Sequence, residues 1–384
     1  MEIKRTPEDG LVLLQQRVET TLAQVTRDDI FPHAAPSATG VWEGTRAGMW
    51  TSGFWAGLLW QWAEQTGAAE DTAVAAGWTL RLAPLLDRHT HDIGFIFSNS
   101  AILGWEHGRD PRCRDLALRA ADRLAGMFNQ KIGVIPVGSE AEIAAGLDDV
   151  TIDCMMNLPL LWWSWKTTGE ERFMQVAVSH ADRTAAWHLK QDGRIIQSTH
   201  FDPETGQVTK QETHQGSGED GCWSRGQAWA IYGFAAAYRA TAEERFLEVA
   251  DRAATYYFLR AGDDLVPFYC FDDPARPNVP RDSSAAAIAC AGLTILAEHA
   301  TGPVRQRSRD RAEALLTQML TRYLTPLGEG DGRPHGMLLH GCYNKNAGWH
   351  TDHELIWGDY YLLEALRSHS RLKRCQGTAE RKSA

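Results

Sequence analysis

The sequence predicts an all-α protein that forms one toroid of six helical hairpins, an (α/α)6 barrel. Three observations support this prediction: apolar residues recur at helical spacing, the turns between helices share one design, and long loops separate the hairpins. The spacing is clear at Phe246, Val249, Ala253 and Tyr256, which fall at steps of three, four and three on one helix face. With 384 residues, of which 43% are hydrophobic and 23% charged, the chain can bury a large core.

The turns within the hairpins follow one pattern. In each, Gly or another small residue ends one helix and polar, mostly acidic residues open the next; these turns lie at 62–71, 165–173, 238–246 and 297–305. The second helices are alike too, since EERFMQVA (170–177) and EERFLEVA (243–250) match at six of eight places. The pattern therefore indicates a repeated hairpin.

Periodicity predicts about a dozen helices, near 8–26, 51–66, 70–88, 97–107, 112–129, 154–168, 171–188, 224–240, 243–258, 283–299, 304–323 and 353–368. Six hairpins cannot bury both faces alone, so they must stack as an open solenoid or a closed ring. Long links rich in Gly, His and Pro favour the ring, because in a toroid they gather at one mouth and build a pocket; they lie at 130–152, 189–222, 259–282 and 324–352. We expect one catalytic domain over 1–384, with a disordered tail from about residue 370.

Composition excludes several classes of protein. A formal charge of −10 and a pI near 5.8 argue against a nucleic-acid partner. The longest apolar stretch, 284–297, is too short to span a membrane, and the first 22 residues lack the apolar run of an export signal. The seven cysteines form no C-x-x-C pair, so reduced thiols and a cytoplasmic location are expected.

Several tryptophans stand beside polar loop residues, where an indole can stack on a sugar ring; they are Trp42, Trp50, Trp55, Trp223, Trp229, Trp349 and Trp357. Trp162, Trp163 and Trp165 are interpreted as core instead. The most informative stretch is 213–234, in which a Gly-rich loop leads into a helix with Arg225 and Trp229 one turn apart. They offer a guanidinium fork for a carboxylate beside an indole for a sugar face.

Two aspartates lie in unusually apolar segments, Asp92 in HDIGFIF and Asp153 in TIDCMMNLPL. Each stands near a predicted helix start, where N-capping would explain it. Together, at the mouths of consecutive hairpins, they become candidates for general acid–base chemistry, because apolar surroundings and a neighbouring carboxylate both raise the pKa of an acid.

Seven segments, in order, resemble the motifs of the unsaturated glucuronyl hydrolases (glycoside hydrolase family 88), bacterial enzymes with an (α/α)6 barrel: HDIGFIF, IDCMMNLPLLWW, HFDPETG, THQG, WSRGQAW, DSSAAAIA and HELIWGDYYLLEAL. The match runs from about Trp50 to Leu366. It implies removal of a 4,5-unsaturated uronic acid from the non-reducing end of an oligosaccharide of disaccharide size that a polysaccharide lyase has made. An acid protonates C4 of the C4=C5 bond and water adds at C5.

The resemblance also implies roles for individual residues. Asp153 resembles the catalytic acid/base and Asp92 the second carboxylate, while Trp50 resembles an aromatic wall of the pocket. Contacts to the unsaturated sugar are implied for His200, Gln215, Arg225 and Trp229. The resemblance implies no metal. We also expect no cofactor, no membrane partner, and a monomer or homodimer.

Two features of the sequence are not explained by the resemblance to this family. The loop 217–222 (SGEDGC) differs from the residues expected after THQG, and its Glu219 would disfavour an anionic or sulfated leaving sugar. A cluster of His335, His340, His350, His353 and Glu354 suggests a metal site, but its spacing matches no H-E-x-x-H pattern.

Three alternatives stay open. Two are other enzymes on the same barrel, a hydrolase for unsaturated rhamnogalacturonyl products and a sugar epimerase, which would need histidine acid–base partners. The third is a carbohydrate-binding protein without catalysis, against which the two poorly solvated carboxylates, Asp92 and Asp153, argue.

Overall fold

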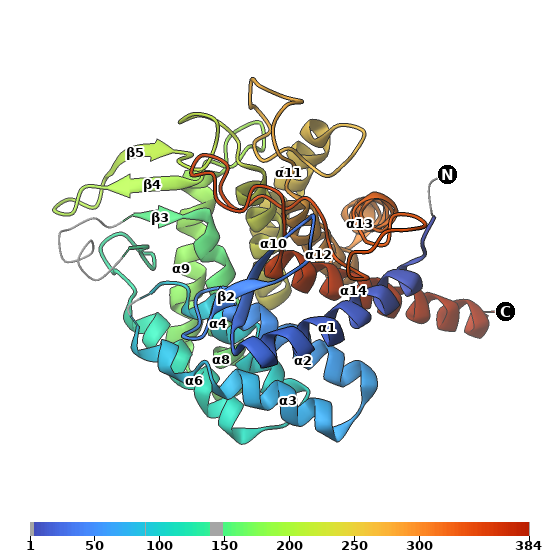
Figure 1. Cartoon of the computed structure of the whole chain (residues 1–384). Coiled ribbons are helices and arrows are strands. Elements are labelled where there is room, and N and C mark those ends of the chain that lie inside the picture. The colour runs from blue at the N-terminus through green and yellow to red at the C-terminus, as the bar shows by residue number, and fades with distance from the viewer. Residues whose placement is uncertain (1–3, 89, 139–148, 384) are drawn as a thin grey trace.

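The computed structural model describes residues 4–88, 90–138 and 149–383 (Figure 1). Its helices are α1 (Pro7–Asp28), α2 (Ser52–Thr66), α3 (Ala69–Leu80), α4 (Ile93–Ser98), α5 (Ala101–Glu106), α6 (Pro111–Gly126), α8 (Leu158–Thr168), α9 (Glu171–His188), α10 (Ser224–Thr241), α11 (Glu244–Ala261), α12 (Ser283–His299), α13 (Gly302–Arg322) and α14 (Ile356–Ser383). Two 3-10 helices, η1 (Ala83–Asp87) and η2 (Ile152–Asn157), accompany them. No described helix is both long enough and apolar enough to cross a bilayer.

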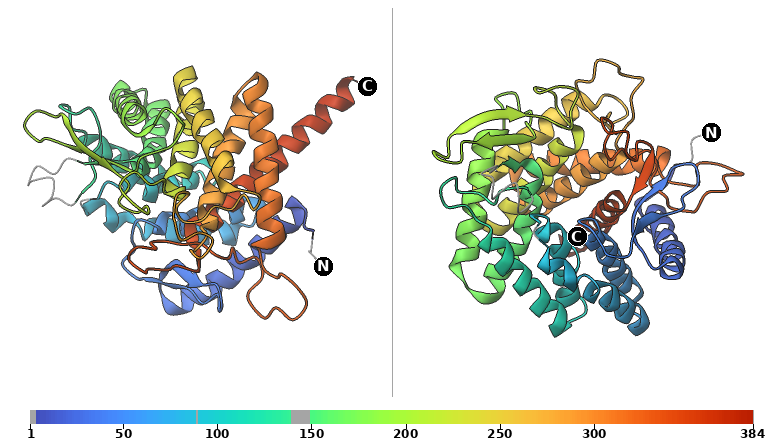
Figure 2. Two further views of the ribbon diagram at one scale, coloured as in Figure 1. Left: turned by 90° about the horizontal axis from the view of Figure 1, so that it is seen from above. Right: turned by 60° about the vertical axis from the view of Figure 1, so that its left-hand side comes forward.

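The helices close into a ring, as the sequence predicts. An inner set contacts in the order α2, α4, α8, α10, α12, α14 and back to α2. The outer helices α3, α6, α9, α11, α13 and α1 pack against this set, and Figures 1 and 2 show the two layers around one axis. The fold is therefore an (α/α)6 barrel rather than an open solenoid.

Burial explains which helices lie inside. Helix α12 buries every residue from Ser283 to Ala297, and α10 buries every residue from Ser224 to Tyr238. A helix that is apolar all round can only lie in the interior, whereas an outer helix such as α11 buries one stripe and turns charged residues to water. The sequence thus assigns the two layers through its Ala- and aromatic-rich helices.

Four predicted helices differ clearly from those observed. The segment predicted as 97–107 is split into α4 and α5, because the side chains of Ser98, Asn99 and Ser100 donate hydrogen bonds to carbonyl groups of the preceding turn. The segment at 70–88 ends as α3 and continues as η1 after a break, and the one at 154–168 begins with η2. Helix α14 continues to Ser383, so the backbone is helical beyond residue 370, where a disordered tail was expected.

Two small antiparallel sheets flank the barrel. One has the order β2 (Glu43–Thr45), β1 (Phe31–Pro36), β6 (His353–Leu355), and the other has the order β3 (Val150–Thr151), β4 (Ser198–Phe201), β5 (Val208–Glu212). In the first, Ala34 pairs with Leu355, and in the second His200 pairs with Lys210. The second sheet is built from the long links at 130–152 and 189–222, whereas β1 and β2 lie between α1 and α2 and β6 directly precedes α14.

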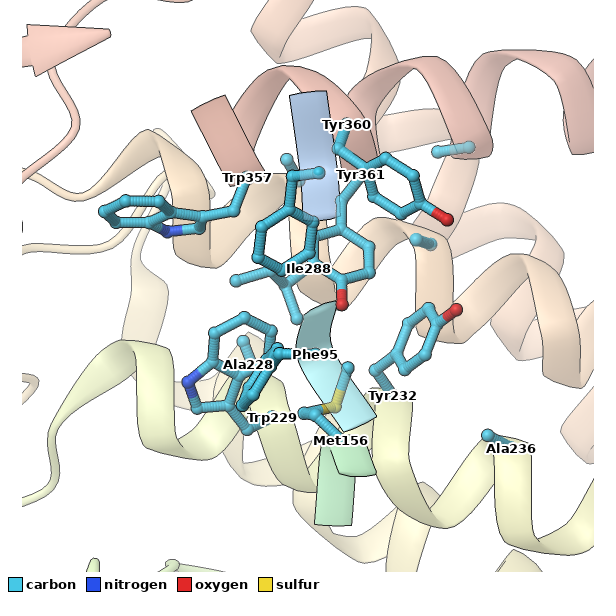
Figure 3. Close-up of a cluster of buried hydrophobic side chains, with 14 of the residues drawn as sticks. Phe95, Met156, Ala228, Trp229, Tyr232, Ala236, Ile288, Trp357, Tyr360 and Tyr361 are labelled. Carbon is cyan, nitrogen blue, oxygen red and sulfur yellow. The ribbon is translucent and has the colours of Figure 1, made fainter. Parts of the chain in front are cut away.

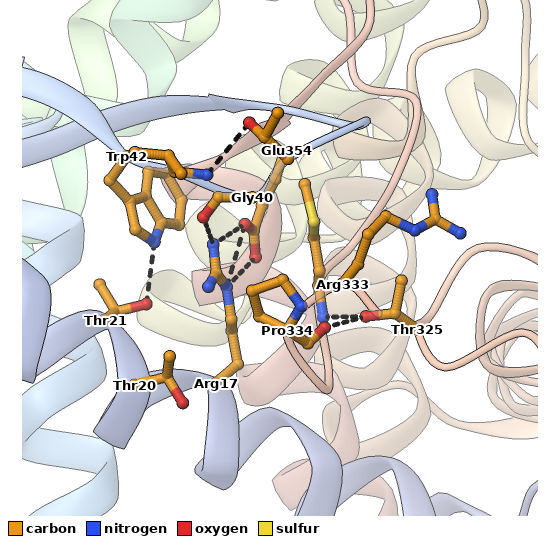
Figure 4. Close-up of polar contacts among 12 residues, drawn as sticks. Arg17, Thr20, Thr21, Gly40, Trp42, Thr325, Arg333, Pro334 and Glu354 are labelled. Carbon is orange, nitrogen blue, oxygen red and sulfur yellow. Dashed lines mark hydrogen bonds and ion pairs between the residues drawn. The ribbon is translucent and has the colours of Figure 1, made fainter. Parts of the chain in front are cut away.

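A buried ion pair fixes the first sheet to α1. Arg17 Nε donates to both carboxylate oxygens of Glu354, at 3.0 and 3.1 Å, and Arg17 Nη2 donates to the carbonyl of Gly40 at 2.7 Å (Figure 4). Burial and the neighbouring Glu354 carboxylate raise the pKa of Asp359 well above its usual value, while Arg17 opposes this rise. Glu354, which the sequence groups with histidines as a candidate metal cluster, is therefore engaged in a structural ion pair.

Candidate active site

One cavity collects most of the candidate residues. It has a volume of about 140 Å³ and lies where the loops before α2, α4 and α10 meet η2. Its lining comprises Trp50, His91, Asp92, Phe95, Asp153, Gln215, Trp223, Arg225, Trp229 and Tyr343. Asp92, Asp153 and Arg225, which the sequence places in three separate motifs, thus line one cavity.

Asp153 has the electrostatic environment of a proton donor. It lies in the first turn of η2, between the buried residues Ile152 and Cys154. Burial raises the pKa of Asp153 to about 6, although Arg225 and a hydrogen bond from Thr151 oppose the rise, and the charge of Asp92 adds to it. With a pKa of about 6, about half of the Asp153 side chains carry a proton at pH 6, and a protonated carboxyl group can deliver its proton to a substrate atom.

Asp92 provides a second carboxylate at the same cavity. It occupies the N-cap position of α4, yet its side chain makes no capping hydrogen bond there. Instead Oδ1 lies 3.3 Å from Nε2 of His91 and Oδ2 lies 3.3 Å from the hydroxyl of Thr90. With about one fifth of its side chain exposed, Asp92 remains open to the cavity, so capping does not account for it.

A close helix contact sets the separation between the two aspartates. A Cβ on Gly94 would lie 2.2 Å from the Cα of Asn157, so only glycine allows α4 to approach η2 this closely. The approach is fixed by a hydrogen bond of 2.9 Å from the Phe95 amide to the side-chain oxygen of Asn157. Asp92 lies two residues before Gly94, and Asp153 lies in the same short helix as Asn157.

Arg225 is anchored more firmly than its sequence position suggests. Only 2% of it is exposed, and its Nη1 pairs with Asp282 and donates to the carbonyl of Cys342 at 2.7 Å. Nη2 donates to the carbonyl of Tyr343 at 2.5 Å, and the guanidinium lies 4.5 Å from the Trp223 ring centroid. The planar fork is thus held rigidly at the cavity wall.

Aromatic rings form the other walls. The Phe95 ring lies 5.4 Å, centroid to centroid, from both Trp50 and Trp229, and meets each nearly edge to face. Figure 3 shows Phe95 beside Trp229, with Tyr361 and Trp357 from α14 packed across from them. Trp50 therefore lies in the wall that the sequence assigns to it, and Trp229 on α10 lies in the same wall.

The two remaining candidates lie in different surroundings. Gln215 lines the cavity, and its side-chain oxygen accepts a hydrogen bond of 2.6 Å from Gln197. His200 lies on β4 between two carboxylates, with Nδ1 2.8 Å from Asp149 and Nε2 2.9 Å from Glu212. It is not part of the described cavity lining, and its predicted contact to the sugar stays a prediction.

The acidic loop and the histidines also take definite positions. Glu219 is 72% exposed and pairs with Lys210 at 3.0 Å, which reduces its effect on the cavity.

His350 and His353 pack ring against ring beside His33, and burial, with the neighbouring histidines, lowers the pKa of His33 to about 4. Within the described chain no group of three or more His, Cys, Asp or Glu side chains is arranged to hold a metal ion.

Sequence reasoning misses three residues of the site. His91 and Phe95 lie inside the quoted HDIGFIF segment, where their proximity to Asp92 was the available signal. Tyr343 carries no such signal, because it reaches the cavity from a hairpin far along the chain, in which its amide donates to the carbonyl of His350 at 3.0 Å.

Comparison with known proteins agrees with this geometry. The model of Glycosyl Hydrolase Family 88 matches residues 19–260. The chain is 36% identical over 323 residues to the unsaturated glucuronyl hydrolase of Bacillus sp. (strain GL1), which covers 83% of this chain and 85% of that protein. It is 34% identical to the unsaturated chondroitin disaccharide hydrolase of Streptococcus pyogenes serotype M1, over 83% and 80% of the two chains.

The fold compares equally well. The crystal structure of the unsaturated glucuronyl hydrolase from Bacillus sp. GL1 superposes with a TM-score of 0.86 at 34% identity, and covers 94% of this chain and 96% of that one. The chain is therefore a glycoside hydrolase that belongs to glycosyl hydrolase family 88, the family of the unsaturated glucuronyl hydrolases.

Proposed function

We propose that the protein hydrates the C4=C5 double bond of a 4,5-unsaturated uronic acid at the non-reducing end of a short oligosaccharide and thereby releases that sugar. The observation that carries the proposal is the pKa of about 6 for Asp153 inside an aromatic-walled cavity with a second carboxylate. Substrates of this kind arise from polysaccharide lyases, whose elimination reaction leaves the double bond. The names of the relatives, which include a chondroitin disaccharide hydrolase, support this substrate class.

In the proposed reaction Asp153 transfers its proton to C4. Because the substrate is an enol ether, positive charge then develops at C5 and on the ring oxygen. Water attacks C5 and returns a proton to the Asp153 carboxylate, which restores the acid. The hemiketal opens to a ketone at C5, and the hemiacetal left at C1 expels the attached sugar. The separation of the two carboxylates does not therefore report retention or inversion.

We assign supporting roles to the other residues of the cavity. Asp92 stabilises the positive charge that develops near C5 and raises the pKa of Asp153. Arg225 faces the uronate carboxylate with its fixed positive charge, while Trp50 and Trp229 lie against the sugar ring. In the described lining His91 is the single histidine, so the histidine pair that an epimerase would need is not found there.

The cavity volume and the cysteine side chains support the proposed substrate size and a cytoplasmic location. A cavity of about 140 Å³ fits one sugar ring, and the remaining sugar would extend into the loops at its mouth. The cysteine side chains in the described chain are buried and free, which favours the reducing cytoplasm.

The test is a panel of lyase-generated unsaturated disaccharides that differ in leaving sugar and sulfation. The double bond absorbs ultraviolet light, so its hydration is read as loss of absorbance. We expect the absorbance to fall with at least one member of the panel. Absorbance that stays constant across the whole panel, while saturated uronides are cleaved, would contradict the proposal.

A further inference from the structure

The side-chain amide of Gln215 has a defined orientation that its neighbour Gln197 determines. An amide oxygen and nitrogen are interchangeable in shape, so their assignment must come from the hydrogen-bond partners. The backbone N–H of Gln215 can only donate, and it lies 2.9 Å from the side chain of Gln197. The atom of Gln197 that faces it must therefore be the oxygen.

The rest of the orientation follows from that one contact. Because its oxygen faces the Gln215 N–H, the side-chain nitrogen of Gln197 is the donor in the second contact, 2.6 Å to the side chain of Gln215. The acceptor there must be the oxygen of Gln215. Consequently the NH2 group of Gln215 is directed away from Gln197 and is available on the other side.

Two features of the structure border the Gln215 side chain. One is the cavity, which Gln215 lines. The other is Tyr269, whose buried side chain interacts with that of Gln215. Burial raises the pKa of Tyr269, whereas the Gln215 side chain lowers it, as a hydrogen-bond donor would. This agrees with an NH2 group on the far side of the Gln215 amide.

Gln197 itself is placed to be rigid. Gln197 is 1% exposed. Its backbone N–H donates to the hydroxyl of Thr213 at 3.3 Å, and its backbone carbonyl accepts from the backbone N–H of Ile152 at 2.9 Å. Ile152 directly precedes Asp153. Gln197 therefore connects the loop that carries Gln215 to the segment that carries Asp153. Gln197 is not in the cavity lining, and it can act on a substrate only through other residues.

We propose that Gln197 is a positioning residue that holds Gln215 with its NH2 group toward the cavity, so that Gln215 donates a hydrogen bond to an acceptor oxygen of the unsaturated sugar. The inference rests on the proposed function for its substrate but not for its geometry. It assigns Gln215 to the donors of the site, beside Arg225, and leaves the carboxylates Asp92 and Asp153 as the groups that accept or exchange protons.

The activity test is a double-mutant cycle. In Gln197→Glu both side-chain oxygens accept, so Gln215 must rotate its NH2 group toward residue 197 and present its oxygen to the cavity. We expect kcat/KM to fall about 10- to 100-fold, mainly through KM, since a donor is replaced by an acceptor. In a Gln215→Ala background the same substitution should change kcat/KM less than about threefold, because there is no amide left to rotate.

Matched controls separate rotation from added charge and from damage to the fold. Gln211→Glu introduces a carboxylate on β5 of the same small sheet, where Gln211 contacts Lys190, Trp187 and Thr199 but not Gln215. It should leave KM within about twofold. If Gln197→Glu fails to fold, Gln197→Met, which neither donates nor accepts, should lower kcat/KM a few-fold in the wild-type background only. Equal losses with and without Gln215 would overturn the proposal.

A neutron structure of the wild-type protein reads the amide directly and needs no substrate. Deuterium on the Gln215 atom that faces the cavity supports the proposal, and deuterium on the atom that faces Gln197 overturns it. A wild-type protein that is inactive on every unsaturated disaccharide, but carries deuterium on the cavity side, would overturn the proposed function and leave the orientation standing.

Discussion

Arg225 and Asp282 form a buried ion pair beside the cavity, with 2% and 0% of their side chains exposed. Asp282 also caps α12, since its Oδ1 accepts from the amide of Ser284 at 3.1 Å. One carboxylate therefore fixes both the cation of the site and the start of an inner helix.

Replacing Asp282 should destabilise the fold. In Asp282→Ala the guanidinium of Arg225 stays buried without its counter-charge, and breaking such a pair costs about 3–5 kcal/mol. The free energy of unfolding in urea measures the effect. The control is Asp182→Ala, which breaks the exposed pair with Arg245 and should cost less than about 1 kcal/mol. Equal effects of the two variants would contradict this account.

Arg225→Lys should lower kcat/KM at least about tenfold although it keeps the charge. A lysine ammonium can still reach Asp282, but it cannot also span the carbonyls of Cys342 and Tyr343 as the planar fork does. Steady-state kinetics on an unsaturated disaccharide measure the loss. Arg245→Lys at the protein surface serves as the control and should be neutral, and an unchanged Arg225→Lys enzyme would remove Arg225 from the site.

Asp153→Asn should lower kcat by about 10²–10⁴-fold while substrate binding survives, because an amide keeps the shape but has no acidic proton to give to carbon. The measurement is the rate of absorbance loss, with binding followed separately by calorimetry. If the variant retained a near wild-type rate, Asp92 would be the next residue to test as the acid.

Wild-type activity should decline as the pH rises above about 6, because the acid must be protonated and the pKa of Asp153 is about 6. The same shift affects stability. Since the pKa is raised above the unfolded value of 3.8, the contribution of Asp153 to stability is complete below pH 4 and is lost as the pH rises through 6. Asp153→Asn should therefore show a weaker decrease in the free energy of unfolding between pH 4 and 6 than the wild type.

Gly94→Ala should lower both stability and activity. Its Cβ would lie 2.2 Å from the Cα of Asn157, a backbone atom that cannot move aside, and overpacking of this kind costs about 1–3 kcal/mol. As α4 moves away from η2, Asp92 moves away from Asp153. Gly77→Ala on the outer helix α3 is the matched control, since nothing lies within 4 Å of its Cβ, and it should stabilise the fold by about 0.5–1 kcal/mol. A stable and fully active Gly94→Ala enzyme would contradict the account.

The helices and their arrangement in a ring could be predicted from the sequence because periodicity reports which face of a helix is buried. Their interruptions could not, since the break at Ser98, Asn99 and Ser100 depends on side chains that compete for backbone carbonyls in one particular conformation. Likewise the partner of Glu354 is Arg17, more than 300 residues away, and no local pattern identifies it.

The site was predictable where its residues lie in compact motifs, as Asp92, Asp153 and Arg225 do. The contacts that these side chains make could not be predicted in the same way. Arg225 was expected to offer a free fork, but Asp282 and two carbonyls already hold it, because residues remote in sequence converge on α10. His200 carries the correct residue type for a sugar contact, yet its ring lies between Asp149 and Glu212, a pairing that only the register of β3, β4 and β5 creates.

The closure of the ring by α14 against α2 has a consequence for folding. Trp50 packs against Trp357 and Phe54 packs against Tyr361, so the cavity wall at Trp50 is supported by residues about three hundred positions further along the chain. Closing so long a loop costs chain entropy before these contacts can stabilise the structure. We therefore expect these contacts to form late in folding. A growing chain that ends before α14 therefore exposes indole and phenyl rings to water, and chaperones that bind apolar segments should retain such chains until the last inner helix has docked.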